Sequence, residues 1–230
     1  KKNFHVIGID NFIGGYKDNV SKRSEFHNMD CCDLQKLNSI MSGVEVVYHC
    51  AATAHEGLSV FSPYEITKNN YLASVAVFTA AIKNNIKRII FCSSMARYGS
   101  QKIPFTEEQI PDPIDPYGIS KVAAEKVLIN LCELNNIEWV IAVPHNIIGP
   151  RQKYDDPFRN VVSIMLNRML LDKAPIIFGD GNQKSEYIAH AKLDFINKIG
   201  LKEQLSPTRA NGLLSMIKQM KLYAIAFSKK

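Results

Sequence analysis

Apolar runs and helical patterns alternate along the first 150 residues of the chain. Short runs rich in β-branched residues predict buried strands at 4–10, 26–30, 44–50, 88–92 and 139–143. Apolar residues at helical spacing lie between these runs and predict helices at 34–41, at 63–84 and from Tyr117 to Leu131. This alternation is typical of a parallel sheet with helices on both faces. The predicted fold class is therefore α/β with a doubly wound parallel sheet.

The pattern changes after residue 150, and we predict a domain boundary there. The first domain then spans residues 1–150 and a second region spans residues 151–230. A loop, a helix and a strand are predicted in the second region, at 151–158, 160–171 and 175–178. Beyond about residue 185 the sequence has only helix-like periodicity and no recognisable motif.

The composition excludes several classes of function. The 230 residues are 46% hydrophobic and 22% charged, which suffices for one core, or for one large domain with a small lobe. The net charge of +6 comes from scattered residues, so a solvated basic surface is favoured and attraction of an anionic ligand is the alternative. No basic stripe interleaved with aromatics is present, and no run approaches the roughly 18 apolar residues of a membrane span. We therefore expect neither nucleic acid nor a membrane as a partner.

Five cysteines are present: Cys31, Cys32, Cys50, Cys92 and Cys132. No pair has CxxC spacing and no histidine cluster accompanies them, so we expect reduced thiols and no metal site. Reduced thiols and the lack of a secretory signal favour a cytoplasmic protein.

The spacing YxxxK occurs three times, at Tyr64/Lys68, Tyr98/Lys102 and Tyr117/Lys121. Only Tyr117 and Lys121 open a long amphipathic helix soon after a buried strand that ends in serines. Residues four apart lie on one face of a helix, where a Lys ammonium would lower the phenol pKa from about 10 toward neutrality. The phenolate could then remove a proton from a substrate hydroxyl. We expect Tyr64 and Tyr98 to be ordinary tyrosines.

Two further polar positions follow predicted strands. Ser93 and Ser94 come directly after the strand 88–92, where a hydroxyl can bond a substrate oxygen beside the tyrosine or simply cap a helix. Asp10 ends the run 4–10. In a dinucleotide-binding fold an acid at such a strand end accepts hydrogen bonds from the adenosine ribose and favours NAD over NADP. A turn-forming Asp10 is an equally good interpretation.

Three segments taken together resemble the extended short-chain dehydrogenase/reductase family, and within it the NAD-dependent sugar-nucleotide epimerases and dehydratases such as UDP-glucose 4-epimerase. They are SSMARYG at 93–99, PYGISK at 116–121 and NIIGP at 146–150. Shorter similar segments are VIGIDN at 6–11, MDC at 29–31, HCAA at 49–52 and the asparagines at 69–70. The resemblance covers roughly residues 4–184, and it is specific because the motifs occur together and in order.

The resemblance implies that residues 1–150 form a NAD-binding Rossmann domain and that residues 151–230 form a partial substrate-binding region. It implies three catalytic residues: Ser94, Tyr117 and Lys121. It implies NAD contacts by Asp10, Asn11, Asp30, Cys31, Cys50, Ala51, Ala52, Asn70, Tyr117, Lys121 and His145. It implies that Ser94 and Asn146 contact the sugar nucleotide.

The implied reaction is epimerisation of a nucleotide-activated sugar, at C4 of a UDP-sugar, through a transient 4-keto intermediate with NAD as cofactor. Dehydratases of this family place an Asp-Glu pair after the active-site Thr, whereas this chain has Met95 and Ala96 there, so water elimination is disfavoured. A dehydratase or reductase of the same fold, or an inactive fragment, is the alternative. Arg97 replaces an apolar residue of the family, and the sequence offers no reason for it. A homodimer is also implied as possible.

The chain departs from the family pattern at both ends. The glycine-rich GxxGxxG turn and the first strand, expected upstream of Asp10, are absent, so we expect a truncated sheet with two exposed inner edges. Near the C-terminus Ser185 stands where an arginine should grip the diphosphate, and residues 186–230 look unrelated to the family. Arg159, together with Arg151, is our candidate for the missing positive charge at the substrate.

Overall fold

The computed structural model describes residues 4–149, 151–158, 161–176, 188–189 and 224–228. The chain divides into two compact units. Lys1–Val143 and Ile225–Lys230 form the first unit, and Pro144–Ala224 forms the second. The division falls a few residues before the predicted boundary at 150, and the C-terminal residues return to the first unit.

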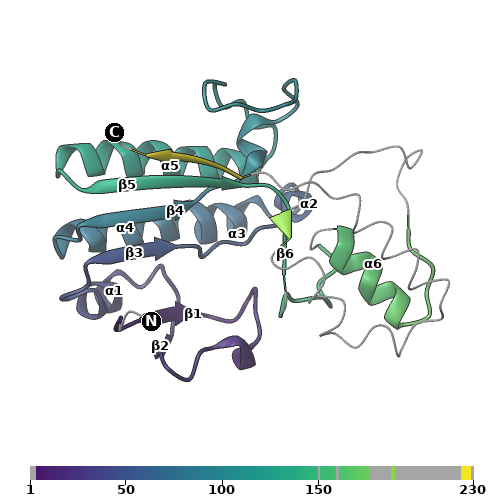
Figure 1. Ribbon diagram of the computed structural model, residues 1–230, viewed down its shortest axis with the longest axis horizontal. Coiled ribbons are helices and arrows are strands. Elements are labelled where there is room, and N and C mark those ends of the chain that lie inside the picture. The colour runs from purple at the N-terminus through teal and green to yellow at the C-terminus, as the bar shows by residue number, and fades with distance from the viewer. Residues whose placement is uncertain (1–3, 150, 159–160, 177–187, 190–223, 229–230) are drawn as a thin grey trace. The chain divides into compact units, whose positions relative to one another are not determined.

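Parallel strands form the frame of the first unit (Figure 1). One sheet pairs β1 (Ile7–Asp10) with β2 (Glu25–Asn28). The other has the order β3 (Val46–His49), β4 (Arg88–Cys92), β5 (Glu138–Pro144) and β8 (Ala224–Ser228). The pairs β1–β2, β3–β4 and β4–β5 are all parallel, which confirms the predicted α/β fold class.

The two sheets remain separate within the described part of the chain. Among the described strands β1 pairs only with β2, and β3 pairs only with β4. One edge of β1 and one edge of β3 therefore have no partner among the described strands. Both sheets still belong to one unit, because the loop after β2 reaches the helical segment after β3, where the Cys32 thiol donates to the Lys68 carbonyl oxygen at 3.7 Å.

The helix predicted at 63–84 consists of two α-helical segments joined by a π-helical turn. It comprises α3 (Pro63–Thr67), a single π-helical turn η2 (Lys68–Leu72) and α4 (Ala73–Lys83). Single π turns inside α-helices are frequently found at functional sites. The other helices of the first unit are α1 (Leu34–Ile40), the short α2 (Glu56–Ser59) and the long α5 (Pro116–Leu134).

The start of α5 is fixed by its own sequence. Pro116 occupies the first turn, where its missing N–H costs no hydrogen bond. Asp115 caps the helix, and its carboxylate accepts the N–H of Gly118 at 2.9 Å. Tyr117 therefore stands in the first helical turn.

The hydrophobic core lies between the β3–β4–β5 sheet and the helices α1, α4 and α5. Its fully buried side chains include Leu37, Phe78, Phe91, Leu128, Ile141 and Val143. Each large side chain buried in this way stabilises the fold by about 1.5–3 kcal/mol. On the opposite face of β3, Tyr48 is 73% exposed. In the described residues, the helices thus cover the face of this sheet that carries His49 and Phe91.

The second unit contains α6 (Val161–Leu170) and the parallel pair of β6 (Ile147–Ile148) with β7 (Ile188–Ala189). The helix agrees with the prediction at 160–171. Ile176, in the predicted strand 175–178, is not in a strand, and residues 177–178 lie outside the described residues. The purely helical pattern predicted beyond 185 is wrong at β7 and β8. No described helix is long and apolar enough to cross a membrane.

Candidate active site

The candidate active site forms where β4 ends and α5 begins. The backbone leaves β4 at Cys92, passes Ser93 and Ser94, and enters the short 3-10 helix η3 (Met95–Tyr98). Ser94 caps η3 by accepting the N–H of Ala96 at 3.2 Å. In parallel α/β sheets the carboxyl ends of the strands are the usual place for ligands.

Tyr117 meets Ser94 at this strand end. The two hydroxyl groups share a hydrogen bond, and the Tyr117 side chain is 6% exposed. Gly118 permits the approach of α5 to η3, because a Cβ at that position would lie 2.7 Å from the carbonyl oxygen of Ala96. A side chain there would push the helix away from the serine. Glycine at 118 is therefore part of what brings the predicted pair together.

The ionisation of Tyr117 differs from the prediction. Burial raises the pKa of Tyr117 to about 12, and the hydrogen bond from Ser94 only partly offsets this. Lys121 was expected to lower that pKa. Instead its ammonium donates to the carbonyl oxygen of Cys92 at 2.8 Å and lies 4.9 Å from the centre of the Phe91 ring. Desolvation of the phenol therefore sets the direction of the shift, against the prediction from helix spacing.

Lys121 is itself perturbed by its surroundings. The side chain is buried, and burial lowers its pKa to about 8, against the opposing effects of Cys92, Cys50 and Glu125. A lysine with a pKa near 8 can change its charge with a small change in environment. The helix spacing puts it one turn beyond Tyr117, as the sequence analysis expected.

A buried ion pair behind the site was missed by the sequence analysis and accounts for Arg97. The Arg97 guanidinium contacts the Glu125 carboxylate at 3.2 Å, and the two side chains are 9% and 4% exposed. The Ser93 hydroxyl donates to the same carboxylate. Burial raises the pKa of Glu125, whereas the Ser93 hydrogen bond and the charges of Arg97 and Lys121 lower it. Arg97 is therefore the counter-charge of a carboxylate buried beneath the two serines.

Asn70 supports the site from the π turn η2. Its fully buried amide accepts the N–H of Thr53 at 2.7 Å and donates to the carbonyl oxygen of Thr53 at 3.2 Å. Asn69 adds a hydrogen bond to the Thr53 hydroxyl at 3.1 Å. These contacts fix the chain that leaves β3. Asn70 therefore holds Thr53 in place, and its expected contact with the cofactor stays a prediction.

A buried histidine extends this network into the core. His49 Nε2 lies 2.8 Å from the Ser74 hydroxyl, which in turn donates to the carbonyl oxygen of Asn70. Because the Ser74 proton is used in that bond, the imidazole is the donor to Ser74. Burial lowers the pKa of His49 to about 3, so this histidine is neutral.

The residues expected to hold the adenosine end of NAD cluster at the ends of β1 and β2. Asp10 accepts the N–H of Phe12 at 2.6 Å, and Asp30 accepts the N–H of Cys32 at 2.8 Å. Burial, then the charges of Asp30, Cys32 and Asp10, raise the pKa of Cys31 to about 11. Asp10 thus forms a turn, and its exposed carboxylate also lies at a strand end. Both interpretations of Asp10 are compatible with this geometry.

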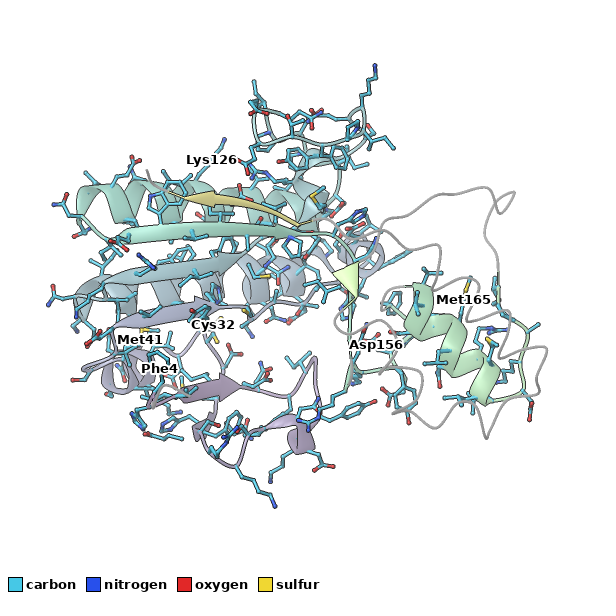
Figure 2. The ribbon with its side chains drawn as sticks, viewed as in Figure 1. Phe4, Cys32, Met41, Lys126, Asp156 and Met165 are labelled. Atoms are coloured by element: carbon cyan, nitrogen blue, oxygen red, sulfur yellow. The ribbon has the colours of Figure 1, made fainter. Side chains whose placement is uncertain are left out.

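Asn11 and Cys32 also lie near the ends of β1 and β2. Asn11 accepts the N–H of Ile13 at 3.2 Å and belongs to the same loop as Asp10. Cys32, labelled in Figure 2, lies on the loop after β2. Two exposed carboxylate or amide side chains at strand ends suit ribose hydroxyls.

The remaining predicted residues fall into three groups. Cys50 and Ala51 are exposed directly after β3, with the half-buried Ala52 following them. His145 and Asn146 belong to the second unit, between β5 and β6, and Asn146 has a left-handed backbone with φ of 44°. Arg159 and Ser185 lie outside the described residues.

The two competing YxxxK tyrosines have no comparable environment. Tyr64 is 77% exposed on α3. Tyr98 is fully buried, donates its hydroxyl to the carbonyl oxygen of Thr106 at 3.0 Å and stacks on Phe105 at 4.8 Å. Tyr98 therefore anchors the loop that follows η3.

A parallel α/β sheet with a Ser-Tyr pair and a lysine at one strand end defines the class of Rossmann-type short-chain dehydrogenase/reductase proteins. Within that class, the family model described as the NAD dependent epimerase/dehydratase family matches residues 1–191, and the chain belongs to this family. A second model, of an Fe-S metabolism associated domain, matches residues 176–224, most of which lie outside the described residues.

Individual relatives are sugar-nucleotide epimerases. The chain is 35% identical over 195 residues to a protein of Methanocaldococcus jannaschii assigned provisionally as a UDP-glucose 4-epimerase, covering 82% of this chain and 62% of that protein. A UDP-glucose 4-epimerase of Thermotoga maritima, solved with UDP-glucose, has a TM-score of 0.77 at 28% identity over 86% of this chain and 66% of that one. A UDP-N-acetylglucosamine 4-epimerase of Methanobrevibacter ruminantium has a TM-score of 0.76 at 30% identity, with 86% and 65% covered. The chain thus spans about three fifths of the curated relatives it matches.

Proposed function

We propose that this chain is a NAD-dependent epimerase of a nucleotide-activated sugar and acts at C4 of a UDP-sugar. The observation that carries the proposal is the hydrogen bond between Tyr117 and Ser94, with Lys121 one helical turn beyond at the end of β4. A phenol, a hydroxyl and an ammonium in this order suit proton removal from a sugar hydroxyl. The named activity of the relatives supports the choice of substrate.

Ser94, Tyr117 and Lys121 have different roles in the proposed reaction. Ser94 orients the sugar 4-hydroxyl, and Tyr117 takes its proton and later returns it. Lys121 supplies positive charge beside the developing phenolate. This charge has to offset the burial that raises the pKa of Tyr117. Bound NAD would supply reversible hydride acceptance at C4 of the sugar, and Lys121 would hold its nicotinamide ribose.

The chain has residues that fit the adenosine end of NAD. Asp10 would accept the ribose hydroxyls, and Asp30 would face the adenine. Small residues, Cys50, Ala51 and Ala52, directly follow β3 and leave room for a dinucleotide to pass that strand end. His145, Asn146 and Arg159 remain proposed contacts of the cofactor and the sugar nucleotide.

A dehydratase is the second candidate, and the side chains after Ser94 argue against it. Met95 packs against the hydrophobic core, and Ala96 carries only a methyl group. Neither can donate or accept a proton at the sugar, as a 4,6-elimination requires.

NADH binding is the first test, by fluorescence titration of the purified chain. We expect saturable binding that weakens at least tenfold in Lys121→Met and Asp10→Asn. Lys126→Met is the matched control, because Lys126, labelled in Figure 2, is an exposed lysine of the same helix. An affinity that is equal in all these variants would contradict the assigned NAD site.

Turnover is the second test, measured as interconversion of UDP-glucose and UDP-galactose. Tyr117→Phe is expected to lower kcat by about 10²–10⁴, the usual contribution of a general base. Tyr64→Phe is the matched control, since Tyr64 has the same YxxxK spacing but an exposed ring. In deuterated water, label at C5 of the product would indicate elimination chemistry, whereas an unlabelled C5 supports C4 epimerisation.

Gly118→Ala tests the geometry that carries the proposal. The added Cβ would meet the Ala96 carbonyl oxygen and separate Tyr117 from Ser94. We expect kcat to fall at least tenfold while NADH affinity changes less. Full turnover in this variant would show that the close approach of α5 to η3 is not needed.

A further inference from the structure

Two cysteines lie at the ends of neighbouring strands. The parallel register pairs His49 of β3 with Phe91 of β4, and Cys50 and Cys92 are the residues that directly follow this pair. Side chains alternate along a strand, so the Cys92 thiol points to the face away from Phe91. Neighbouring strands are about 4.8 Å apart, and this lies within the Cα separation that disulfides span.

The two thiols already interact. Cys50 donates a hydrogen bond to Cys92, and this bond, helped by the charge of Lys121, lowers the pKa of Cys92 to about 6 against the effect of burial. The same bond and burial raise the pKa of Cys50. Cys50 and Lys121 change the pKa of Cys92, and a charge on Cys92 in turn raises the pKa of Tyr117. The lowered pKa of Cys92 and the raised pKa of Cys50 make Cys92 the sulfur that ionises more readily and Cys50 the one that keeps its proton, which are the two forms that successive steps of thiol oxidation consume.

The other three cysteines have environments that favour the protonated thiol or exclude solvent. Burial is the main cause that raises the pKa of both Cys31 and Cys32 to about 11. Cys132 is fully buried in the core. Only Cys50 is exposed, and Cys92 is half-buried beside it.

We propose that Cys50 and Cys92 form a reversible disulfide when the protein meets a peroxide. The Cys92 thiolate attacks one peroxide oxygen, the O–O bond breaks, and a sulfenic acid and a hydroxide ion form. The Cys50 sulfur then attacks the sulfenic sulfur, the S–S bond forms, and the hydroxyl leaves as water after taking up the thiol proton. In total two thiols lose two electrons and two protons, and one hydrogen peroxide becomes two waters. A dithiol reductant reverses the change by thiol–disulfide exchange.

Mass spectrometry tests this directly and needs no enzymatic activity. The full chain is treated with hydrogen peroxide, free thiols are blocked with N-ethylmaleimide, and tryptic peptides are mapped before and after reduction. We expect a species lighter by two hydrogen atoms, with one crosslinked pair that joins the peptides of Cys50 and Cys92. A crosslink that involves Cys31, Cys32 or Cys132 instead would overturn the proposal, as would oxidation of Cys92 only to sulfinic acid.

Matched serine variants separate the pair from general oxidation. Cys50→Ser and Cys92→Ser must each abolish the crosslink, whereas Cys31→Ser must leave its yield unchanged. The buried Cys132 is an internal gauge of folding, because it reacts with N-ethylmaleimide only where the core opens. Variants are therefore compared under conditions in which Cys132 stays unlabelled. A crosslink of unchanged yield in Cys50→Ser or in Cys92→Ser would contradict the proposed disulfide.

The rate of alkylation provides an independent measurement. Because the thiolate is the reactive form, labelling of Cys92 should fall about tenfold per pH unit below pH 6 and level off above it. Cys50→Ser exchanges the thiol donor for a weaker acid, and Lys121→Met removes the positive charge. Both variants should move the midpoint of the Cys92 profile to higher pH. An unchanged midpoint in both would mean that neither group stabilises the thiolate.

Discussion

Removing Arg97 should reveal how strongly the buried carboxylate beneath the active site depends on its counter-charge. The guanidinium is 3.2 Å from Glu125 and both side chains are nearly inaccessible. Breaking such a pair by truncating one partner typically costs about 3–5 kcal/mol, because the other charge stays buried. Arg97→Met keeps much of the side-chain volume but not the charge, so we expect a loss of stability in this range.

The loss should depend on pH with a definite sign. Burial raises the folded-state pKa of Glu125 above its unfolded value, and loss of Arg97 raises it further. Between those two pKa values the folded protein holds more protons than the unfolded one, so stability falls as pH rises through the window. The cost of Arg97→Met should therefore be larger at pH 8 than at pH 5, where Glu125 can bind a proton more readily.

Urea denaturation followed by fluorescence of Trp139 measures this loss. Trp139 is the single tryptophan, lies on β5 and packs against the core of the first unit. With a slope of about 2 kcal/mol per molar urea, the midpoint should fall by about 1.5–2.5 M. Arg97→Met combined with Glu125→Gln should recover most of it, because the amide still accepts the Ser93 hydroxyl. An unchanged midpoint at pH 8, or no recovery in the double variant, would refute the reasoning.

Three further changes should alter stability in defined ways. Gly99→Ala should cost more than about 2 kcal/mol, since φ is +55° and the new Cβ would collide with a backbone oxygen, whereas Gly57→Ala, with open space around it, should cost nothing in the same urea assay. Asn70→Ala should cost about 1–3 kcal/mol for each Thr53 backbone group left unpaired, read by thermal unfolding; a change below 0.5 kcal/mol would contradict the clamp. His49, with its pKa lowered to about 3 by burial, contributes stability that is present above pH 6.5 and lost as pH falls toward 3, by up to about 4 kcal/mol. His49→Gln should flatten that part of the stability profile, and an equally steep profile would exclude His49 as its cause.

The elements predicted well are those that are marked by a pattern of apolar and polar residues within their own few positions. The strand 88–92 was predicted with the bounds that β4 has in the structure, because it is a short apolar run between polar ends. The break in the helix 63–84 was not predicted, since a π turn leaves the apolar pattern almost unchanged. The strand β8 was also missed, because it depends on pairing with β5, which precedes it in sequence by about 80 residues.

The candidate site shows the same contrast between local and long-range information. The pairing of Tyr117 with Ser94 followed from two motifs and their order. The role of Arg97 could not be predicted, because its partner Glu125 is on another element and looks like an ordinary surface charge of a helix. The pKa of Tyr117 was predicted in the wrong direction, because spacing gives proximity to Lys121 but not the extent of burial or the direction in which the ammonium points.

One face of α5 connects the stability of the first unit to its chemistry. Tyr117, Lys121 and Glu125 follow one another at intervals of four residues, so all three lie on the same face of the helix. Each meets a different group of the segment that ends β4: the first meets the Ser94 hydroxyl, the second the Cys92 carbonyl oxygen and the third the Ser93 hydroxyl. A rotation of the helix by one residue, about 100°, would break all three contacts together. The buried carboxylate therefore fixes the register that the proposed base and the lysine require, which is a physical reason to keep a charge where an apolar residue would pack more easily.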